Sequence, residues 1–312
     1  MLSLPALSLL HQLKLRGTLT AAAAAMRLSR SAASHQLAAL QRAVGLPLTE
    51  KVGRGLRLTE AGAALAVQAG RVLDELEGTT AVLETMRDRL SGTVRLAAVQ
   101  TFAISAVPTL VAGLRDRHPA LRLETTTIVA EHAVLAVAAG EVDVAVVPSY
   151  RTDPIPATEG IHAVRLFHDP VRLAVPGSHR LAGGTGAVSL SQLRDERWVA
   201  GDAGSYFGEL VAMLCSRAGF VPDIAHRSGD YAVVASLVSA GLGVALIPAI
   251  AHLSRWPDVV VRPLRSRQAG RDLVALMRNG SVHRPTVGEV VSALRRYRPG
   301  PAVPSEPTIP EP

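Results

Sequence analysis

The side chains whose types and spacing could do chemistry begin in the stretch TAAAAAMRLSRSAASHQLAAL, residues 20–40. Residues 33–44 repeat apolar side chains at helical spacing and predict a helix with one buried face. Four side chains then point outward from its first two turns: Arg30, Ser31, Ser34 and His35. A guanidinium pairs with guanine through two hydrogen bonds, and short hydroxyls reach bases or phosphates. The pattern favours a recognition helix that enters the major groove of DNA.

A basic segment, EKVGRGLRL, follows this helix and predicts a glycine-turned hairpin. Its Lys51, Arg54 and Arg57 would meet phosphates on either side of the groove. Thr20 and Ser29 are expected to cap the two alanine-rich helices and are counted with the candidate DNA-binding residues. Alanine suits such a helix pair because it is the best helix former. The alternative is that the outward arginine and serine side chains are simply solvated.

Length and charge narrow the class of protein. The chain has 312 residues, 48% of them hydrophobic, which is typical of a globular protein with two or three domains. The formal net charge is +7, and up to Gly62 eight basic side chains stand against two glutamates. This concentration of positive charge is expected of a surface that binds a polyanion. With a single cysteine, Cys215, and an N-terminus without signal-peptide features, we expect a cytoplasmic protein.

The first ninety residues predict helices and one hairpin. Residues 4–15 form a first helix that completes a three-helix unit with the two alanine-rich helices. From Thr59 to Leu90 apolar residues recur at alternating spacings of four and three, the pattern of a two-stranded coiled coil. The seam consists of Leu65, Ala69, Val72, Leu76, Thr79, Leu83, Met86 and Leu90. We expect this helix to dimerise; the alternative is a long amphipathic helix packed on its own domain.

Beyond Gly92, strands and helices alternate in two similar series, which predicts two α/β lobes with mainly parallel sheets covered by helices. The tract 232–253 is apolar enough to suggest a membrane span, but Gly241, Gly243 and Pro248 divide it into a helix, a turn and a buried strand. We therefore expect no membrane partner. From Pro299 onward, six prolines and few apolar residues predict a disordered tail.

The segment GTLTAAAAAMRLSRSAASHQLAALQRAVGLPLTEKVGRGLRLTEAG, residues 17–62, resembles the winged helix-turn-helix of LysR-type transcriptional regulators. The motifs GTVRLAAV, GEVDVAVVP, HDPVRLAVPGSHRLA, AGF and LVSAGLGVALIP are similar in order and spacing to that family's effector domain, so the resemblance reaches about Tyr297. Thr49 and Lys51 stand where many members have an aromatic residue and an arginine, and His35 stands where a longer basic or amide side chain is frequent. These departures concern base preference.

The resemblance implies an α/β fold with three functional parts and a tail. Residues 1–58 would form the winged helix-turn-helix, 59–91 the linker and dimerisation helix, 92–298 a two-lobed effector domain like a periplasmic binding protein, and 299–312 the tail. Lobe I would comprise 92–163 and 265–298, and lobe II 164–264. The chain would cross between the lobes near Ala163–Val164 and Val261–Leu264, which would act as the hinge.

Candidate effector-binding residues follow from the expected lobes. Ligands of open α/β sheets lie beyond the carboxyl ends of strands and at helix N-termini. That criterion selects Thr101, Thr127, Ile128, Ser149, Gly204, Ser205 and Asp230. Capping or turn chemistry would explain each of them equally well, taken one at a time.

Catalysis is not expected. Cys215 lies mid-helix among apolar residues, the ten histidines show no close metal pairing, and GLGVAL lacks the third glycine of a dinucleotide motif, so we expect no metal and no cofactor. A redox sensor at Cys215 would lack a resolving cysteine.

The sequence therefore predicts a ligand-responsive transcriptional regulator. Its expected partners are double-stranded DNA with a pseudo-palindromic promoter site, a small-molecule effector, and further copies of itself in a homodimer or homotetramer. The alternative is a cytoplasmic small-molecule-binding or enzymatic α/β protein whose N-terminal helices mediate assembly. The effector, the operator and the choice between activation and repression stay open.

Overall fold

The N-terminal unit is a three-helix bundle with a two-stranded wing. The computed structural model describes residues 2–53, 55–86, 89–150, 154–251, 253, 256–265 and 270–298. The first elements are α1 (Leu4–Arg16), α2 (Leu19–Ala25), α3 (Arg30–Val44), β1 (Thr49–Val52) and β2 (Gly55–Leu58). The antiparallel pair β1–β2 is the wing, and it confirms the predicted hairpin. Arg54, a predicted phosphate contact, lies outside the described residues.

Alanine packing accounts for the composition of α2 and α3. Ala22 and Ala33 are completely buried, and they share a core with Leu37, Leu40 and the leucines of α1. Their small side chains leave room for close-packed helices, in which little space remains unfilled. Because Leu37 and Leu40 are fixed in this core, the opposite face of α3 is turned to solvent, as predicted.

The sequence predicts the N-terminal cap of α3 correctly but not that of α2. Ser29 caps α3 as predicted, accepting a hydrogen bond from Ala32 N at 3.1 Å. In α2, however, the cap is Thr18, whose Oγ1 accepts from Ala21 N at 3.2 Å. Because α1 ends at Gly17, with φ at 73°, the extended residue Thr18 directly precedes α2. The prediction that Thr20 is the cap is wrong: Thr20 lies inside α2 with its side chain exposed.

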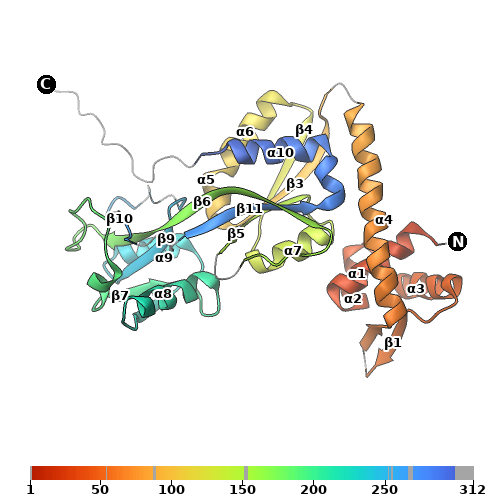
Figure 1. The fold of residues 1–312 in the computed structure, drawn as a ribbon, viewed down its shortest axis with the longest axis horizontal. Coiled ribbons are helices and arrows are strands. Elements are labelled where there is room, and N and C mark those ends of the chain that lie inside the picture. The colour runs from red at the N-terminus through yellow and green to blue at the C-terminus, as the bar shows by residue number, and fades with distance from the viewer. Residues whose placement is uncertain are drawn as a thin grey trace.

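One long helix, α4 (Glu60–Thr85), connects the N-terminal unit to the rest of the chain (Figure 1). Its first half packs on α1, where Ala66 and Ala69 are buried. Further along, α4 exposes apolar side chains that belong to the predicted dimerisation seam, Val72, Leu76 and Leu83, and Met86 just after the helix is exposed as well. The single chain thus leaves this part of the seam uncovered. The helix ends before the predicted Leu90.

The remaining chain forms two α/β lobes that share one sheet (Figure 1). Lobe I contains β3 (Gly92–Ala98), α5 (Gln100–Ser105), α6 (Val107–Arg117), β4 (Leu121–Thr127), α7 (Ala130–Ala138), β5 (Val144–Ser149), β11 (Gly270–Arg278), η2 (Asn279–His283) and α10 (Pro285–Arg296). Lobe II contains η1 (Leu190–Leu193), β7 (Arg197–Ala200), α8 (Tyr206–Arg217), β8 (Asp223–Arg227), α9 (Tyr231–Ser239), β9 (Val244–Pro248) and β10 (Val259–Pro263). The strand β6 (Ile161–Pro176) belongs to both lobes. The strand order is β4-β3-β5-β11-β6-β9-β7-β8, with β10 paired to β6.

The sheet is less uniformly parallel than predicted. The pairs of β3 with β4 and β5, and of β7 with β8 and β9, are parallel. The strands β6, β10 and β11 instead pair antiparallel with their neighbours. The physical reason is the path of the chain, because β6 leaves lobe I and β11 returns to it in the opposite direction.

The long strand β6 also determines where the lobes meet. It pairs with β11 as far as Pro170 and with β9 from Val171 on. This change of partner lies further along the chain than the predicted crossing at Ala163–Val164. The return crossing falls after Pro263, the end of β10, and before Gly270, the start of β11. The strand β6 continues unbroken through Asp169–Pro170, where the partner changes, so a pattern that separates strands by their turns did not locate the change.

The apolar tract that suggested a membrane span folds as α9 and β9, in agreement with the sequence interpretation. Within the described ranges, the structure contains no helix with both the length and the apolar character needed to cross a bilayer.

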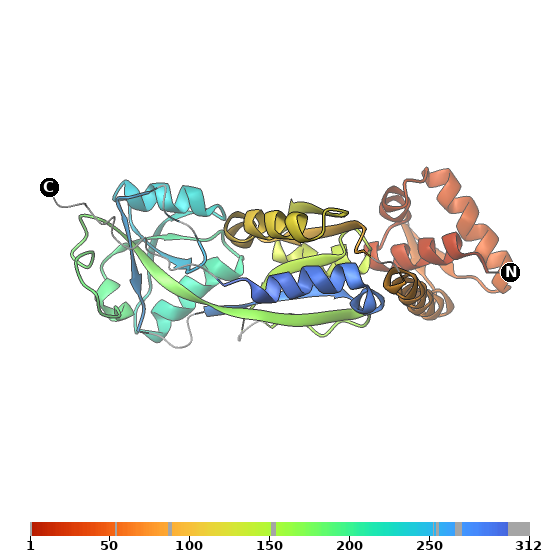
Figure 2. The same cartoon turned by 90° about the horizontal axis from the view of Figure 1, so that it is seen from above.

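The helix α4 lies against the end of lobe I, as the views from the side and from above both show (Figures 1 and 2). Its backbone approaches η2 so closely that a Cβ at Gly280 would lie 2.3 Å from the carbonyl oxygen of Asp74. Only glycine fits there without displacing backbone. The N-terminal unit adds a second contact, because Gln12 and Arg16 of α1 bind Ala139 O and the Glu141 carboxylate just after α7.

Two carboxylates of α4, the half-buried Glu77 and the buried Glu84, reinforce this interface. Glu77 accepts hydrogen bonds from Arg278 at 2.8 Å and from the Ser281 hydroxyl at 2.5 Å. Glu84, which is 8% exposed, accepts from Arg284 at 3.0 Å and from the Thr286 hydroxyl at 2.8 Å. All four donors belong to lobe I, so two carboxylates of α4 are satisfied by lobe I.

Within lobe I, Asp143 completes the network. It accepts hydrogen bonds from the backbone and side chain of Arg95 and from Arg278 at 3.3 Å. Burial by itself would raise the pKa of Asp143, but the hydrogen bonds from Arg95 outweigh burial and hold the pKa below its usual value. The carboxylate therefore stays charged and keeps Arg278 oriented toward α4.

We predict that Glu84→Ala lowers the free energy of unfolding by about 3 kcal/mol, because it leaves Arg284 partly buried without its carboxylate. The matched control is Glu75→Ala, which changes an exposed glutamate on the same helix and should alter the free energy by less than about 0.5 kcal/mol. Urea unfolding of both variants measures the difference. Equal effects would show that the buried carboxylate does not hold the interface.

Candidate nucleic-acid interface and lobe junction

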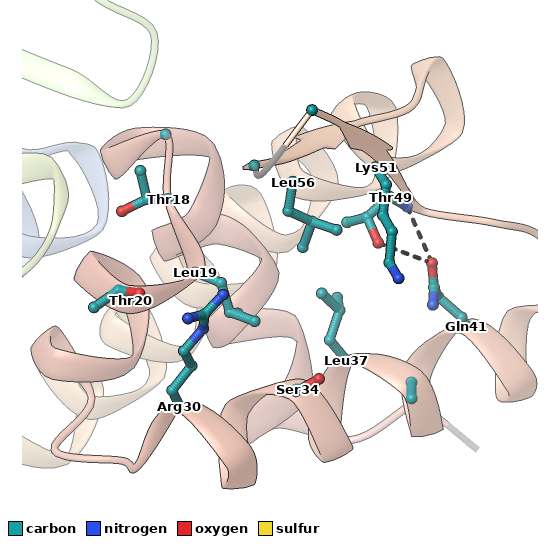
Figure 3. Close-up of a pocket in the computed structure, with 14 residues that line it drawn as sticks. Thr18, Leu19, Thr20, Arg30, Ser34, Leu37, Gln41, Thr49, Lys51 and Leu56 are labelled. Atoms are coloured by element: carbon teal, nitrogen blue, oxygen red, sulfur yellow. Dashed lines mark hydrogen bonds between the residues drawn. The ribbon is translucent and has the colours of Figure 1, made fainter.

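A groove of about 860 Å³ lies between α2, α3 and the wing, and we call it the α3–wing groove (Figure 3). Its lining residues are Gly17, Thr18, Leu19, Thr20, Arg30, Ser34, Leu37, Ala38, Gln41, Thr49, Lys51, Gly53, Gly55 and Leu56. This lining combines two basic side chains with hydroxyls, and none of these described residues is acidic. Such a surface attracts phosphates and offers donors to base edges.

The predicted outward residues of α3 are where the sequence placed them. Arg30, Ser31, Ser34 and His35 are all exposed, and Arg30 and Ser34 line the α3–wing groove. The Ser31 hydroxyl lies 3.0 Å from that of Ser29, at the start of the helix. None of the four is covered by another part of the described chain. The first two turns of α3 are therefore free to meet a partner.

The basic residues of the wing do not share one face. Residues of β1 and β2 alternate between the two faces of the hairpin, and the register pairs Lys51 with Leu56 and Glu50 with Arg57. Lys51 lines the α3–wing groove together with Leu56. Arg57 lies on the other face, where it donates to Glu50 at 2.6 Å and 2.9 Å. The structure thus brings Lys51, but not Arg57, to Arg30.

Two of the predicted effector residues lie at the junction of the lobes. Asp230 caps α9 by accepting from Ala232 N at 2.8 Å, and it also accepts from Gln100 of lobe I at 3.3 Å. Thr101 follows Gln100 in α5 and is buried, with its hydroxyl accepting from Arg271 at 2.8 Å. The start of α5 and the start of α9 therefore face each other across the junction.

Three of the other predicted effector residues carry local hydrogen bonds. Ser205 caps α8 by accepting from Gly208 N at 3.1 Å, and Gly204 N donates to Glu209 at 3.3 Å. The Ser149 hydroxyl accepts from Ile155 N at 3.3 Å. Thr127 ends β4 with an exposed side chain, and Ile128 follows it half-buried. Capping and turn chemistry describes the first three of these sites.

The sequence analysis missed an ion pair at the centre of the junction. Arg271 of β11 donates to Asp169 of β6 at 2.9 Å, and both side chains are buried. Asp169 also accepts from Ile250 N at 3.0 Å, so it joins the end of β9 to the two strands that connect the lobes. Beside this pair, burial raises the pKa of the Tyr231 hydroxyl, which therefore stays protonated as a donor. The available signal was a charged residue just before an apolar run, in HDPVRL and GRDLVAL.

The single cysteine is a packing residue. Cys215 has no exposed surface and lies in the core of lobe II among Leu210, Val211 and Leu214. Burial raises the pKa of its thiol to about 12. This burial confirms the interpretation from the sequence, in which the thiol packs among apolar residues.

Two family models match the chain. The model described as "LysR substrate binding domain" matches residues 87–299, and "Bacterial regulatory helix-turn-helix protein, lysR family" matches residues 4–63. A "Probable hydrogen peroxide-inducible genes activator" from Mycobacterium avium is 31% identical over 229 residues, which cover 73% of this chain and 71% of that protein. "Transcriptional dual regulator GltC" from Bacillus subtilis is 26% identical over 243 residues, covering 77% and 79%.

Solved structures share the fold over nearly the whole chain. The structure of a full-length OxyR variant from Pseudomonas aeruginosa has a TM-score of 0.72 and 19% identity, and the match covers 98% of this chain and 99% of that one. Full-length CbnR in complex with its target DNA has a TM-score of 0.56 and 24% identity, covering 95% and 99%. The arrangement of N-terminal unit, long helix and two lobes is thus common to these proteins.

We predict that Cys215 does not react measurably with Ellman's reagent in the native protein at pH 8. A pKa of about 12 leaves roughly one thiol in ten thousand ionised at that pH, and the side chain is buried as well. After denaturation, the assay should detect one thiol per chain. Rapid labelling of the folded protein would contradict the buried position.

Proposed function

The chain belongs to the LysR family of bacterial regulatory helix-turn-helix proteins and is a DNA-binding transcriptional regulator, and we propose that α3 and the wing read a pseudo-palindromic promoter site. In this proposal α3 enters the major groove, Arg30 reads a base, and Ser29, Ser31, Ser34 and His35 reach bases or phosphates. Thr20, Lys51, Arg54 and Arg57 would contact the backbone, with Arg57 the weakest because Glu50 already binds it.

The observation that carries the proposal is the convergence of Arg30, Ser34 and Lys51 on one groove. These side chains come from two elements, a recognition helix and a hairpin, that lie on the same side of the N-terminal core. A helix in the major groove with a basic hairpin beside it lets one residue set sequence preference while another sets affinity. The exposed seam on α4 supports pairing of two such units in a dimer or tetramer.

We further propose that each part of the chain has the function expected from the sequence. Residues 1–58 would bind DNA, 59–91 would link and dimerise, and 92–298 would bind the effector. The effector site would lie at the lobe junction, beside Thr101 and Asp230. The further candidates, chosen because they lie near the ends of strands and the starts of helices, are Thr127, Ile128, Ser149, Gly204 and Ser205. Because Arg271 is neutralised by Asp169, the effector would be held by hydrogen bonds more than by charge.

The names of several relatives link those proteins to hydrogen peroxide. We propose that the input of this chain is a bound small molecule and not thiol oxidation. The chain has one cysteine, and its thiol is buried in the core of lobe II. An intramolecular disulfide therefore cannot form, and a buried thiol of raised pKa is a poor nucleophile toward peroxide. The protein would act in the cytoplasm and without catalysis.

We predict distinct effects of three substitutions on binding to the chain's own upstream promoter DNA. Arg30→Ala should cost about 1–3 kcal/mol and relax the preference at one base position. Lys51→Ala should weaken binding to all sequences and reduce the salt slope by about one for each bound subunit. Arg57→Ala is the matched control on the opposite face of the wing and should change the slope much less. Gel-shift titrations at several salt concentrations measure all three.

The same titrations separate this function from the rival one, a small-molecule-binding or enzymatic protein whose N-terminal helices mediate assembly. Binding that is absent, or insensitive to salt, would favour that rival. If Arg57→Ala and Lys51→Ala have equal effects, the assignment of the groove face is wrong.

A further inference from the structure

A glutamine side chain connects the recognition helix to the wing. Gln41 lies in the last two turns of α3, and its Oε1 accepts three hydrogen bonds from the start of the wing. The donors are Leu48 N at 2.9 Å, Thr49 N at 3.0 Å and the Thr49 hydroxyl at 3.2 Å. Figure 3 shows Gln41 pointing from α3 toward Thr49, beside Lys51. A single amide oxygen therefore satisfies two backbone donors where β1 begins.

The wing needs such an anchor because an isolated two-stranded hairpin is marginally stable at best. Its base is fixed beneath by Leu48, which is buried and accepts from Thr59 N at 3.1 Å. That hydrogen bond joins the wing to the start of α4, while the Leu48 side chain packs in the core that it shares with Leu37 and Leu40 of α3. The hydrogen bonds of Gln41 are the described polar contacts that relate the wing to the recognition helix. They act two residues before Lys51, which points to the same face of β1 as Thr49.

We infer that Gln41 is a positioning residue for DNA binding, which holds the wing so that Lys51 and Arg30 reach one DNA duplex together. The inference rests on the proposed function of the α3–wing groove. Gln41 acts here through its carbonyl oxygen, and its effect on DNA is exerted through Lys51. Without the Gln41 amide, the backbone at the start of β1 loses its acceptor, and Lys51 loses its fixed distance from α3. The Lys51 side chain, which would bind the phosphate, is itself unchanged.

The test uses Gln41→Met, which removes the acceptor at nearly the same side-chain volume and helix propensity. DNA affinity should fall roughly fivefold per subunit at about 0.15 M salt, the value of one lost phosphate contact. The salt slope should fall by about one per subunit, as for Lys51→Ala. The double variant Gln41→Met with Lys51→Ala should bind within about twofold of Lys51→Ala alone, because both changes remove the same contact.

The matched control is Gln36→Met, an identical substitution five residues earlier on α3. The Gln36 Oε1 atom accepts no hydrogen bond from the described residues, so this change leaves the wing contacts intact and should leave the salt slope unchanged. Additive losses in the double variant, or a salt slope in Gln41→Met equal to that of the wild type, would overturn the inference.

Hydrogen exchange gives a readout that does not depend on DNA or on a variant that folds. In the wild type, the amides of Leu48 and Thr49 should be protected like those of the α3 interior; exchange at loop rates would overturn the inference. Protection should be lost in Gln41→Met and kept in Gln41→Glu, whose carboxylate offers the same acceptor.

Wild-type protein that binds no promoter DNA would refute the proposed function, whereas normal binding by Gln41→Met would refute only the role of Gln41.

Discussion

The interface between α4 and lobe I is the constraint on which the rest of the structure depends. Glu77 and Glu84 of the helix are satisfied by arginines and hydroxyls of lobe I, and Gly280 brings the two backbones into contact. A buried carboxylate without such partners would be unfavourable, so the charges define one way for the helix to pack. The DNA-binding end of the chain is consequently held in a fixed relation to lobe I and not to lobe II.

This attachment assigns different roles to the two lobes. Lobe II is joined to lobe I by β6 and β11, by the buried pair of Asp169 and Arg271, and by the contact of Gln100 with Asp230. A ligand acts only through a difference in its affinity for two arrangements. With lobe I fixed on α4, the arrangement open to change is that of lobe II. The helix α7 starts two residues after Ile128, a proposed effector residue, and ends beside the contacts that Gln12 and Arg16 of α1 make with lobe I.

In the N-terminal unit, the buried side chains of α3 determine which of its polar side chains are exposed. Leu37 and Leu40 fix the inner face of α3, and this rotation of the helix is what turns Arg30 and Ser34 outward. The wing then adds a cation from a different element, with its face chosen by the pairing register of the hairpin. A shift of one residue in that register would place Lys51 opposite Arg57 and bring both cations to the same face of the wing. The positions of Arg30 and Lys51 are thus set by separate physical constraints.

Local periodicity determined most of the fold. The amphipathic spacing of α3, the glycine-turned hairpin and the alternation of strands and helices in both lobes follow from neighbours in the chain, and the Ser29 cap follows from its place before a helix. What the sequence left undecided depended on where one element ends, on how strands pair, or on residues far apart in the chain. The cap at Thr18 followed from where Gly17 ends α1, and the faces of Lys51 and Arg57 depended on strand register. The pairing of Asp169 with Arg271, and of Glu84 with Arg284, depended on segments more than a hundred residues apart meeting in space. Local patterns record which side chains are buried, but only the tertiary structure decides which partner each buried charge meets.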